Sequence, residues 1–221
     1  ARLLCIMEKV IKMEQVIEYF NTETTENIAR YLLGMYLEHE TPEGKLGGYI
    51  VDCEAYLGPD DQAAHSYGMR HTPRVRAMYE KPGTIYLYTM HTHLILNMIT
   101  QPEGMPQGVM IRGFEPVEGI DQMIRNRHGK TDAAISDGPG KLVEALGISR
   151  ELYGASIFSS SLHLVPEKRR IPQKIDALPR IGIPNKGIWT QQPLRYVVHG
   201  NPYITKQRKA LIKEDNGWRK E

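Results

Sequence analysis

The segment at residues 46–56 constrains the fold of this chain most strongly. It is a run of strand-forming residues that stops at a Gly-Pro turn, and successive side chains of a strand point to opposite faces. Asp52, Glu54 and Tyr56 therefore share one predicted face, and Cys53 belongs to the other, core-facing side. An aromatic neighbour lowers the dielectric around a carboxylate, which can tune it as a general base. The alternative is a solvated edge strand with ordinary surface acids.

The other patterns predict an α+β fold with a mainly antiparallel sheet. A cap at Thr24 or Thr25 begins a helix that ends at Gly34. Apolar runs at residues 85–90 and 94–100 predict a hairpin with His91 and His93 at its tip. Residues 58–81 predict a functional loop with short helical segments. Further expected elements are strands at residues 109–114 and 194–198 and helices at residues 117–127 and 141–146.

Composition indicates one ordinary soluble domain. The chain has 221 residues and a formal net charge of +2, so affinity for nucleic acid must come from local basic clusters. Cys5 and Cys53 lack metal-type spacing, which favours a reducing, intracellular location. No apolar run approaches the roughly 20 residues that cross a bilayer, so we expect no membrane association.

Both ends of the chain are expected to lie outside the main domain. Residues 1–15 are predicted to be an N-terminal extension with a leader-like start, and residues 8–20 form an amphipathic helical pattern. Residues 205–221 mix basic and acidic side chains and predict a fraying or disordered charged tail.

Other catalytic chemistries fit the sequence poorly. The segment at residues 138–141 is too short and proline-rich for a P-loop, although Lys141 could touch a phosphate. His91 and His93 share a strand face and could bind a metal with His65, but such histidines are more often contact residues. The sequence lacks the nucleophile elbow of a Ser/His/Asp hydrolase.

An ordered series of motifs resembles the alkyladenine (3-methyladenine) DNA glycosylases of the mammalian type. The series begins with EAYLGPDD at residues 54–61, AAHS at 63–66 and TPRxRxM at 72–78. Its later members are KPGTIYLY from residue 81, RxxEPxEG from 112, GPGKL from 138, PRIG from 179 and PLRY from 193. A series in this order is far more specific than one short motif.

The resemblance implies a single compact domain at residues 16–204, with a curved antiparallel β-sheet core flanked by helices and a protruding β-hairpin. It implies a monomeric base-excision-repair enzyme that uses no cofactor or metal and binds double-stranded DNA containing a damaged purine. Such an enzyme flips out 3-methyladenine, 7-methylguanine, hypoxanthine or ethenoadenine. A Glu-activated water then hydrolyses the N-glycosidic bond and leaves an abasic site.

The same resemblance places the catalytic roles on two residues. Glu54 is expected to be the general base, and Arg112 is expected to lie close to the water and the nucleotide backbone. Without the family pattern, Arg112 would be a strand-end arginine paired with Glu115 or Glu118.

Four residues are implied to contact the flipped base. The family pattern puts Tyr56 and Tyr88 on its opposite faces, where aromatic rings favour cationic bases. His65 lies at its edge as a donor that disfavours the amino group of adenine, and Asn97 crowds the amino group of guanine. Taken alone, Tyr86 and Tyr88 would be strand core, and His65 a capping histidine or one satisfied by local hydrogen bonds.

The remaining expected contacts are to the DNA duplex. His91 takes the place of the family wedge on a hairpin one residue shorter than in the family, and Met78 presses on the opposite strand or fills a core. The candidates for phosphate contacts, which could also form a solvated basic face, are Arg70, Arg74, Arg76, Lys141, Arg180 and Arg195.

Two other functions remain as alternatives. A non-catalytic nucleic-acid-binding module would not need Glu54 beside Tyr56. An enzyme acting on free nucleosides would have no use for Arg70, Arg74 or a hairpin wedge.

Overall fold

One long strand organises the structure, a computed structural model that describes residues 2–220, with side chains from residue 12 onward. Strand β2 (Gly44–Tyr56) pairs with β5 (Gly108–Glu118) on one edge. On the other edge its first part pairs with β1 (Tyr36–Thr41) and its last part with β8 (Arg195–Val198). Residues 46–55 are consequently all buried. This burial excludes the solvated edge strand.

Every strand pair among residues 2–220 is antiparallel, so the predicted α+β class is confirmed. The order across the sheet is β3, β4, β5, β2, β1, β6, and β7 joins through β8. The strands not yet located are β3 (Ile85–Met90), β4 (His93–Ile99), β6 (Leu162–Val165) and β7 (Ile175–Leu178).

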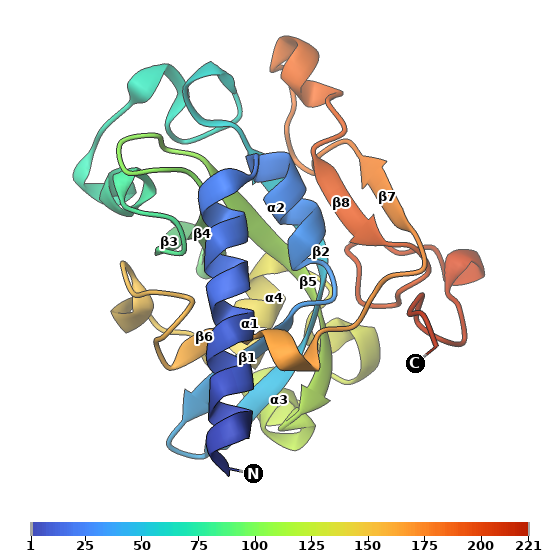
Figure 1. The fold of residues 1–221 in the computed structure, drawn as a ribbon. Coiled ribbons are helices and arrows are strands. Elements are labelled where there is room, and N and C mark those ends of the chain that lie inside the picture. Colours follow the sequence, from blue (N-terminus) through green and yellow to red (C-terminus); the bar gives the residue numbers. More distant parts are fainter. Residues whose placement is uncertain (1, 221) are drawn as a thin grey trace.

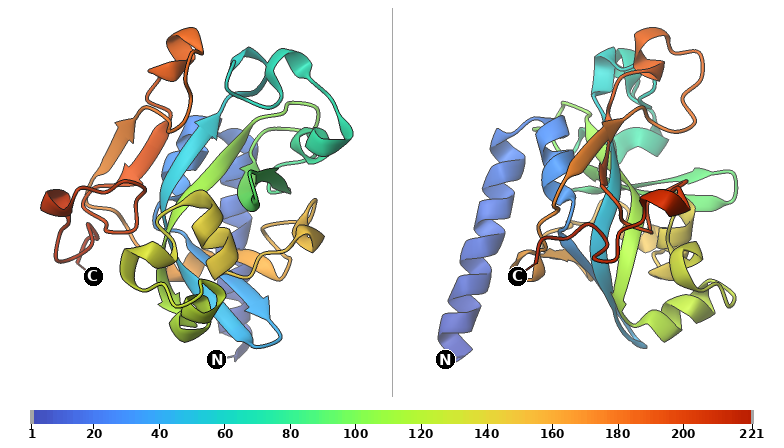
Figure 2. Two further views of the ribbon diagram at one scale, coloured as in Figure 1. Left: turned by 180° about the vertical axis from the view of Figure 1, so that it is seen from behind. Right: turned by 90° about the vertical axis from the view of Figure 1, so that its right-hand side faces the viewer.

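Helices cover both faces of the sheet (Figure 1). Helices α1 (Arg2–Thr22) and α2 (Thr25–Leu32) lie on one face, and α3 (Ile120–Asn126) and α4 (Pro139–Ala145) lie on the other. The β3–β4 hairpin projects from the side opposite α1 (Figure 2, right). Among the described helices, none combines the length and apolar character required to cross a membrane.

The sheet is curved, and irregular pairing in its central strand contributes to the bend. The β2–β5 register shifts on both sides of Asp52, and such bulges bend and twist a strand. Gly113 of β5 lies opposite this point. A Cβ atom there would lie 2.5 Å from the Tyr203 carbonyl oxygen and 2.8 Å from the Asp52 Cβ, so only glycine fits.

Most predicted elements are confirmed, with changed ends. The hairpin turns at His91-Thr92, and the loop at residues 58–81 holds three short 3-10 helices. The helix predicted from residue 117 begins at residue 120 because β5 continues through Glu118. Strands β1, β6 and β7 were not predicted. In β1 the buried Glu38 interrupts the apolar pattern that would have predicted a strand. Lys168 pairs with the Glu38 carboxylate at 3.0 Å.

The N-terminal boundary predicted at residue 15 falls inside the continuous helix α1. Val16 and Phe20 of this helix are buried in the main hydrophobic core. The side chains of the leader-like start at residues 1–7 lie outside the described part of the chain.

The C-terminal segment packs against the domain, so the predicted fraying tail is wrong for residues 205–220. Trp218 is 5% exposed, and its ring centroid lies 5.5 Å from that of Tyr49. Its indole N–H donates to the buried Glu115 carboxylate at 2.9 Å, and the Asn216 amide donates to the same group at 3.2 Å. The sequence prediction rested on the charged composition of the segment and gave no weight to Trp218, its single aromatic residue.

We expect Trp218→Ala to lower the free energy of unfolding by about 3–5 kcal/mol, because it opens a cavity and removes a donor from Glu115. Urea denaturation would measure this change. Trp218→Phe should lose less, and Arg219→Ala, an exposed neighbour, should change stability by less than about 0.5 kcal/mol. Equal stability of Trp218→Ala and the native chain would show that the segment does not support the fold.

Candidate active site

The strand register places residues from four strands in one row across the sheet. Tyr86 pairs with Asn97, Asn97 with Met110, and Met110 with Glu54. Directly paired residues of antiparallel strands project from the same face. Strands β3 and β2 are three spacings apart, about 14 Å in a flat sheet. Curvature of the sheet therefore determines that both ends of the row approach one cavity.

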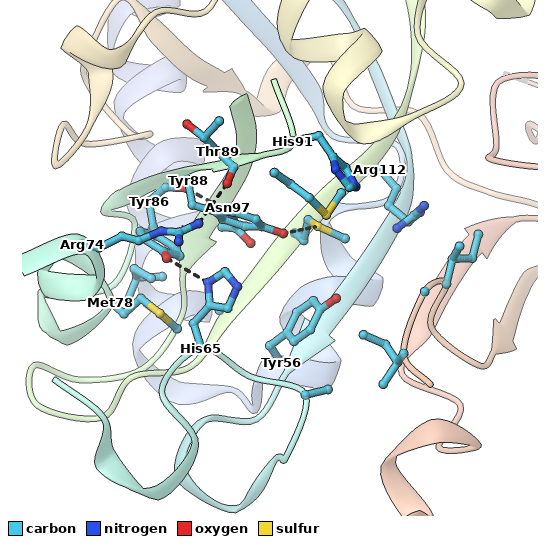
Figure 3. A pocket seen from close by; sticks show the side chains of 18 residues that line it. Tyr56, His65, Arg74, Met78, Tyr86, Tyr88, Thr89, His91, Asn97 and Arg112 are labelled. Atoms are coloured by element: carbon cyan, nitrogen blue, oxygen red, sulfur yellow. Dashed lines mark hydrogen bonds between the residues drawn. The ribbon is translucent and has the colours of Figure 1, made fainter. Parts of the chain in front are cut away.

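A cavity of about 510 Å³ lies at this row, within the size range of ligand sites (Figure 3). Three tyrosines and two histidines contribute aromatic rings to its wall. The rings of His65 and Tyr88 meet edge to face at 4.5 Å, and those of Tyr86 and Tyr88 lie 5.8 Å apart at 30°. The cavity is lined by Tyr56, Ala63, His65, Arg74, Met78, Tyr86, Tyr88, Thr89, Met90, His91, Asn97, Ile99, Gly108, Met110, Arg112, Ile181, Gly182 and Ile183.

Glu54 is fully buried beside this cavity, and three groups of the described chain contact its carboxylate. The Tyr56 hydroxyl donates to Oε2 at 2.8 Å, and the Ile181 N–H donates to Oε1 at 2.8 Å. Arg112 forms an ion pair with Oε1 at 3.1 Å, which excludes the alternative pairing of this arginine with Glu115 or Glu118.

Burial raises the pKa of Glu54, and the positive charge of Arg112 and the Ile181 N–H partly offset that rise. The nearby Asp52 carboxylate raises the pKa further. The environment therefore holds a carboxylate in a fixed position with a basicity greater than that of an exposed glutamate. These are the properties that a general base requires.

The cavity edge carries a histidine whose protonation is biased by its surroundings. Partial removal from water lowers the pKa of His65 although much of the side chain remains exposed, and the positive charges of Arg74 and Arg70 lower it further. Its Nδ1 lies 2.9 Å from the Tyr86 hydroxyl. Burial also raises the pKa of Tyr86, so this hydroxyl keeps its proton and His65 remains neutral near pH 7.

Asn97 and Tyr88 are fixed in the cavity wall by different contacts. Asn97 is 7% exposed, and its amide donates to the carbonyl oxygens of Tyr86 at 3.2 Å and Ile95 at 3.3 Å. The Tyr88 hydroxyl contacts Met110 Sδ at 3.6 Å, and burial raises the pKa of Tyr88 to about 12. Both side chains are therefore neutral surfaces for a ligand.

Arg74 and His91 are basic groups in the cavity wall, and further basic side chains lie on the loop at residues 58–81 and on α4. His91 is exposed at the tip, with a φ of 54°. Arg74 donates to the Thr89 carbonyl oxygen at 2.9 Å, and Lys141 pairs with Asp137 at 2.7 Å. Arg70 and Arg76 are also exposed.

Three of the predicted DNA contacts need correction. Met78 is 4% exposed and belongs to a small core cluster, so it fills the cavity wall and does not protrude. Arg195 is buried and forms a bidentate pair with Asp52, at 2.9 and 2.7 Å. The Arg180 side chain is completely buried in a pair with Asp61. Buried guanidinium groups that are paired with carboxylates cannot reach a DNA phosphate.

Sequence reasoning missed several residues of the site. Tyr86 was expected in the strand core, although its spacing of two from Tyr88 places both rings on one face. Arg150 donates to the Thr89 hydroxyl at 2.6 Å and adds a basic group beside the hairpin. The Ile181 N–H carried no sequence signal, because a backbone donor does not depend on residue type.

The potential metal ligands of the described chain converge elsewhere. Glu38, Glu40 and His163 form the grouping with metal-ligand spacing, and Lys45 already pairs with both carboxylates. The trio of His65, His91 and His93 considered above does not form such a grouping among the described residues.

Comparison with known proteins agrees with the ordered motifs. The family model for methylpurine-DNA glycosylase matches residues 19–202. A protein of Enterococcus faecalis provisionally named 3-methyladenine DNA glycosylase is 69% identical over 96% of this chain and 93% of its own length. Proteins with the same provisional name from Listeria monocytogenes and Staphylococcus carnosus are 49% and 46% identical, over 92% and 91% of this chain and 99% and 98% of their own lengths. The chain therefore belongs to the methylpurine-DNA glycosylase family.

Proposed function

We propose that this chain is a monofunctional DNA glycosylase that removes alkylated or deaminated purines from duplex DNA. The observation that carries the proposal is the buried Glu54 carboxylate, held by Tyr56, Ile181 and Arg112 beside an aromatic cavity. Family membership supports hydrolysis of an N-glycosidic bond in damaged DNA. A non-catalytic binding module would have no need for a buried base.

The proposed reaction uses one water molecule. Glu54 accepts a proton from the water. The oxygen of the water bonds to the sugar C1′ carbon, and the C1′–N bond to the purine breaks. The bonding electrons leave with the base, which becomes neutral when it started as a cationic methylated purine. Arg112 orients the water and the nucleotide, and the carboxylate also stabilises positive charge that develops on the sugar.

The cavity supports recognition of a purine that has left the helix. Tyr56 and Tyr88 supply aromatic faces, and attraction of a cation to such a face contributes up to about 2 kcal/mol. His65 and Asn97 lie at the edge, where they can disfavour the amino groups of normal adenine and guanine. We propose 3-methyladenine, 7-methylguanine, hypoxanthine and ethenoadenine as the substrates.

We propose that duplex DNA covers the mouth of the cavity, with His91 filling the gap left by the flipped nucleotide. The exposed groups available for the phosphates are Arg70, Arg74, Arg76 and Lys141. We also propose that the protein acts as a monomer. A DNA substrate also supports an intracellular location.

We expect Glu54→Gln to reduce the single-turnover excision rate by about 10²–10⁴-fold, because an amide cannot accept the proton of water. Excision of 7-methylguanine from a duplex would be measured with enzyme in excess. DNA affinity and thermal unfolding should be recorded for both proteins, because the substitution also leaves Arg112 without its partner. A rate close to that of the native chain would disprove the role of Glu54.

The product should be an intact abasic site, because none of the described residues lining the cavity is a lysine. The DNA strand should break only after alkali treatment. A covalent adduct trapped with borohydride would contradict a monofunctional enzyme.

The excision rate should fall on acidification, with a midpoint above the ordinary pKa of glutamate. Glu54 works only when ionised, and burial raises its pKa, so its protonation begins at a higher pH than in an exposed side chain. Repeating the profile with His91→Ala removes the contribution of the hairpin imidazole. A rate that is constant down to the ordinary pKa of glutamate would contradict this assignment.

His91→Ala should impair excision from a well-paired duplex far more than from a single strand, where no base stack opposes flipping. The measurement is the ratio of the two rates for one lesion at fixed salt. His93→Ala is the matched control, because it removes an imidazole from the same hairpin. If the two variants give the same ratio as the native chain, His91 is not the wedge.

A further inference from the structure

Arg180 connects three segments of the site from a position that DNA cannot reach. Its Nη1 donates to the carbonyl oxygen of Ala55 at 3.0 Å, between Glu54 and Tyr56 on β2. Both of its terminal nitrogens contact the Asp61 carboxylate, and Nη2 lies 2.9 Å from Oδ1. The side chains of the two residues are each 0% exposed.

The guanidinium of Arg180 also covers one face of the Tyr56 ring. Its central carbon lies 4.6 Å from the ring centroid. Tyr56 lines the cavity, whereas Arg180 does not. A base in the cavity therefore meets a face or an edge of Tyr56 that Arg180 leaves open, and Arg180 supports the ring from behind.

The backbone that follows Arg180 contacts the carboxylate itself. The next residue is Ile181, whose N–H donates to Glu54 Oε1 at 2.8 Å. This N–H is one of the groups that offset the rise in the pKa of Glu54. Movement of Arg180 would therefore disturb the Tyr56 ring and the Glu54 carboxylate together.

Asp61 extends the same connection to the loop that carries His65. Its carboxylate accepts the N–H of Leu57 at 3.1 Å and the N–H of Ala63 at 2.9 Å. Ala63 and His65 both line the cavity. The pair thus joins β2, the loop after it and the segment at residues 180–183.

Stability alone is a weak reason for such a pair. Burying two charges has a large desolvation cost, and apolar side chains of similar volume are often equally or more stabilising. The Arg180 Nε is buried and has no hydrogen-bond partner in the described chain. A buried donor without a partner adds to the cost of this arrangement.

We propose that Arg180, clamped by Asp61, is the positioning residue that fixes the Tyr56 ring and the Ile181 N–H against Glu54. The inference rests on the proposed function and concerns the chemical step. It replaces the phosphate contact expected from the sequence, because the buried guanidinium acts through other residues and touches no DNA.

Arg180→Lys keeps the charge but loses the forked geometry, and Asp61→Asn keeps the shape but loses the clamp. We expect each to lower the single-turnover rate of 7-methylguanine excision roughly 10- to 100-fold, as small misplacements of reacting groups do. The dissociation constant for the lesion duplex should change less than about threefold, because no phosphate contact is lost. An Arg180 that touched DNA would show the opposite pattern, with weakened binding and a preserved rate.

The pH profile separates positioning from general destabilisation. Loss of the Ile181 hydrogen bond should shift the acid limb of the rate profile to higher pH in Arg180→Lys, because that bond favours ionised Glu54. The other groups that act on Glu54 are not substituted in the variant, and displacement of the Tyr56 hydroxyl, which also favours ionised Glu54, would shift the limb in the same direction. They are Asp52, Cys53 and Tyr56 from β2, Tyr88 from β3, Arg112 from β5 and Arg195 from β8.

Arg127→Lys is the matched control. Arg127 also pairs with a carboxylate, that of Glu144, and donates to the Ile135 carbonyl oxygen at 3.1 Å, but it does not line the cavity. Its variant should keep the native rate per folded molecule and the native pH profile. Folded fractions would be determined by thermal unfolding for every protein.

The outcomes distinguish the two proposals. If the native chain excises no lesion, the proposed function fails. If Glu54→Gln abolishes excision while Arg180→Lys and Asp61→Asn retain the native rate and acid limb, the positioning role is overturned. If Arg180→Lys and Asp61→Asn both fail to fold, the Arg180–Asp61 pair serves stability alone. That result would also overturn the positioning role.

Discussion

The structure depends on holding a carboxylate in the interior of a β-sheet. Glu54 is 0% exposed, and an unpaired buried charge is strongly destabilising. The chain offsets this cost with donors that come from separate segments, the Tyr56 hydroxyl, the Ile181 N–H and the Arg112 guanidinium. Each donor must be placed by the fold to within hydrogen-bond distance. The requirement therefore ties β2, β5 and the segment at residues 180–183 to one geometry.

Neighbouring buried ion pairs surround this carboxylate. Asp52 holds Arg195 one strand away, and Asp61 holds Arg180 behind Tyr56. Because each pair is close to neutral, the cluster adds little net charge to the interior. Burying these charged groups is unfavourable, but the buried pairs lie where the positions of the Glu54 carboxylate and the Tyr56 ring must be fixed. Preorganised polar groups of this kind are a common feature of catalytic sites.

The division between rigid and exposed parts matches the two tasks proposed for the protein. The row from Tyr86 to Glu54 lies on paired strands, which hold side chains in fixed positions. The exposed hairpin tip and the loop at residues 58–81 carry His91 and the arginines that face solvent. A flipped base needs a preformed cavity. The phosphates of the DNA backbone can be contacted by long, exposed side chains such as arginine.

The sequence by itself determined the strand at residues 46–56, the shared face of Glu54 and Tyr56, the hairpin and the family. These follow from two-residue periodicity, turn residues and an ordered motif series, which are local properties. Only the tertiary structure decided that Arg180 and Arg195 are buried, that Trp218 anchors the C-terminal segment, and that Ile181 contacts Glu54. Burial of a charged side chain depends on a partner more than 100 residues away, as between Asp61 and Arg180. Local patterns contain no information about such a partner, so an arginine in a basic context is assigned to the surface until the fold is known.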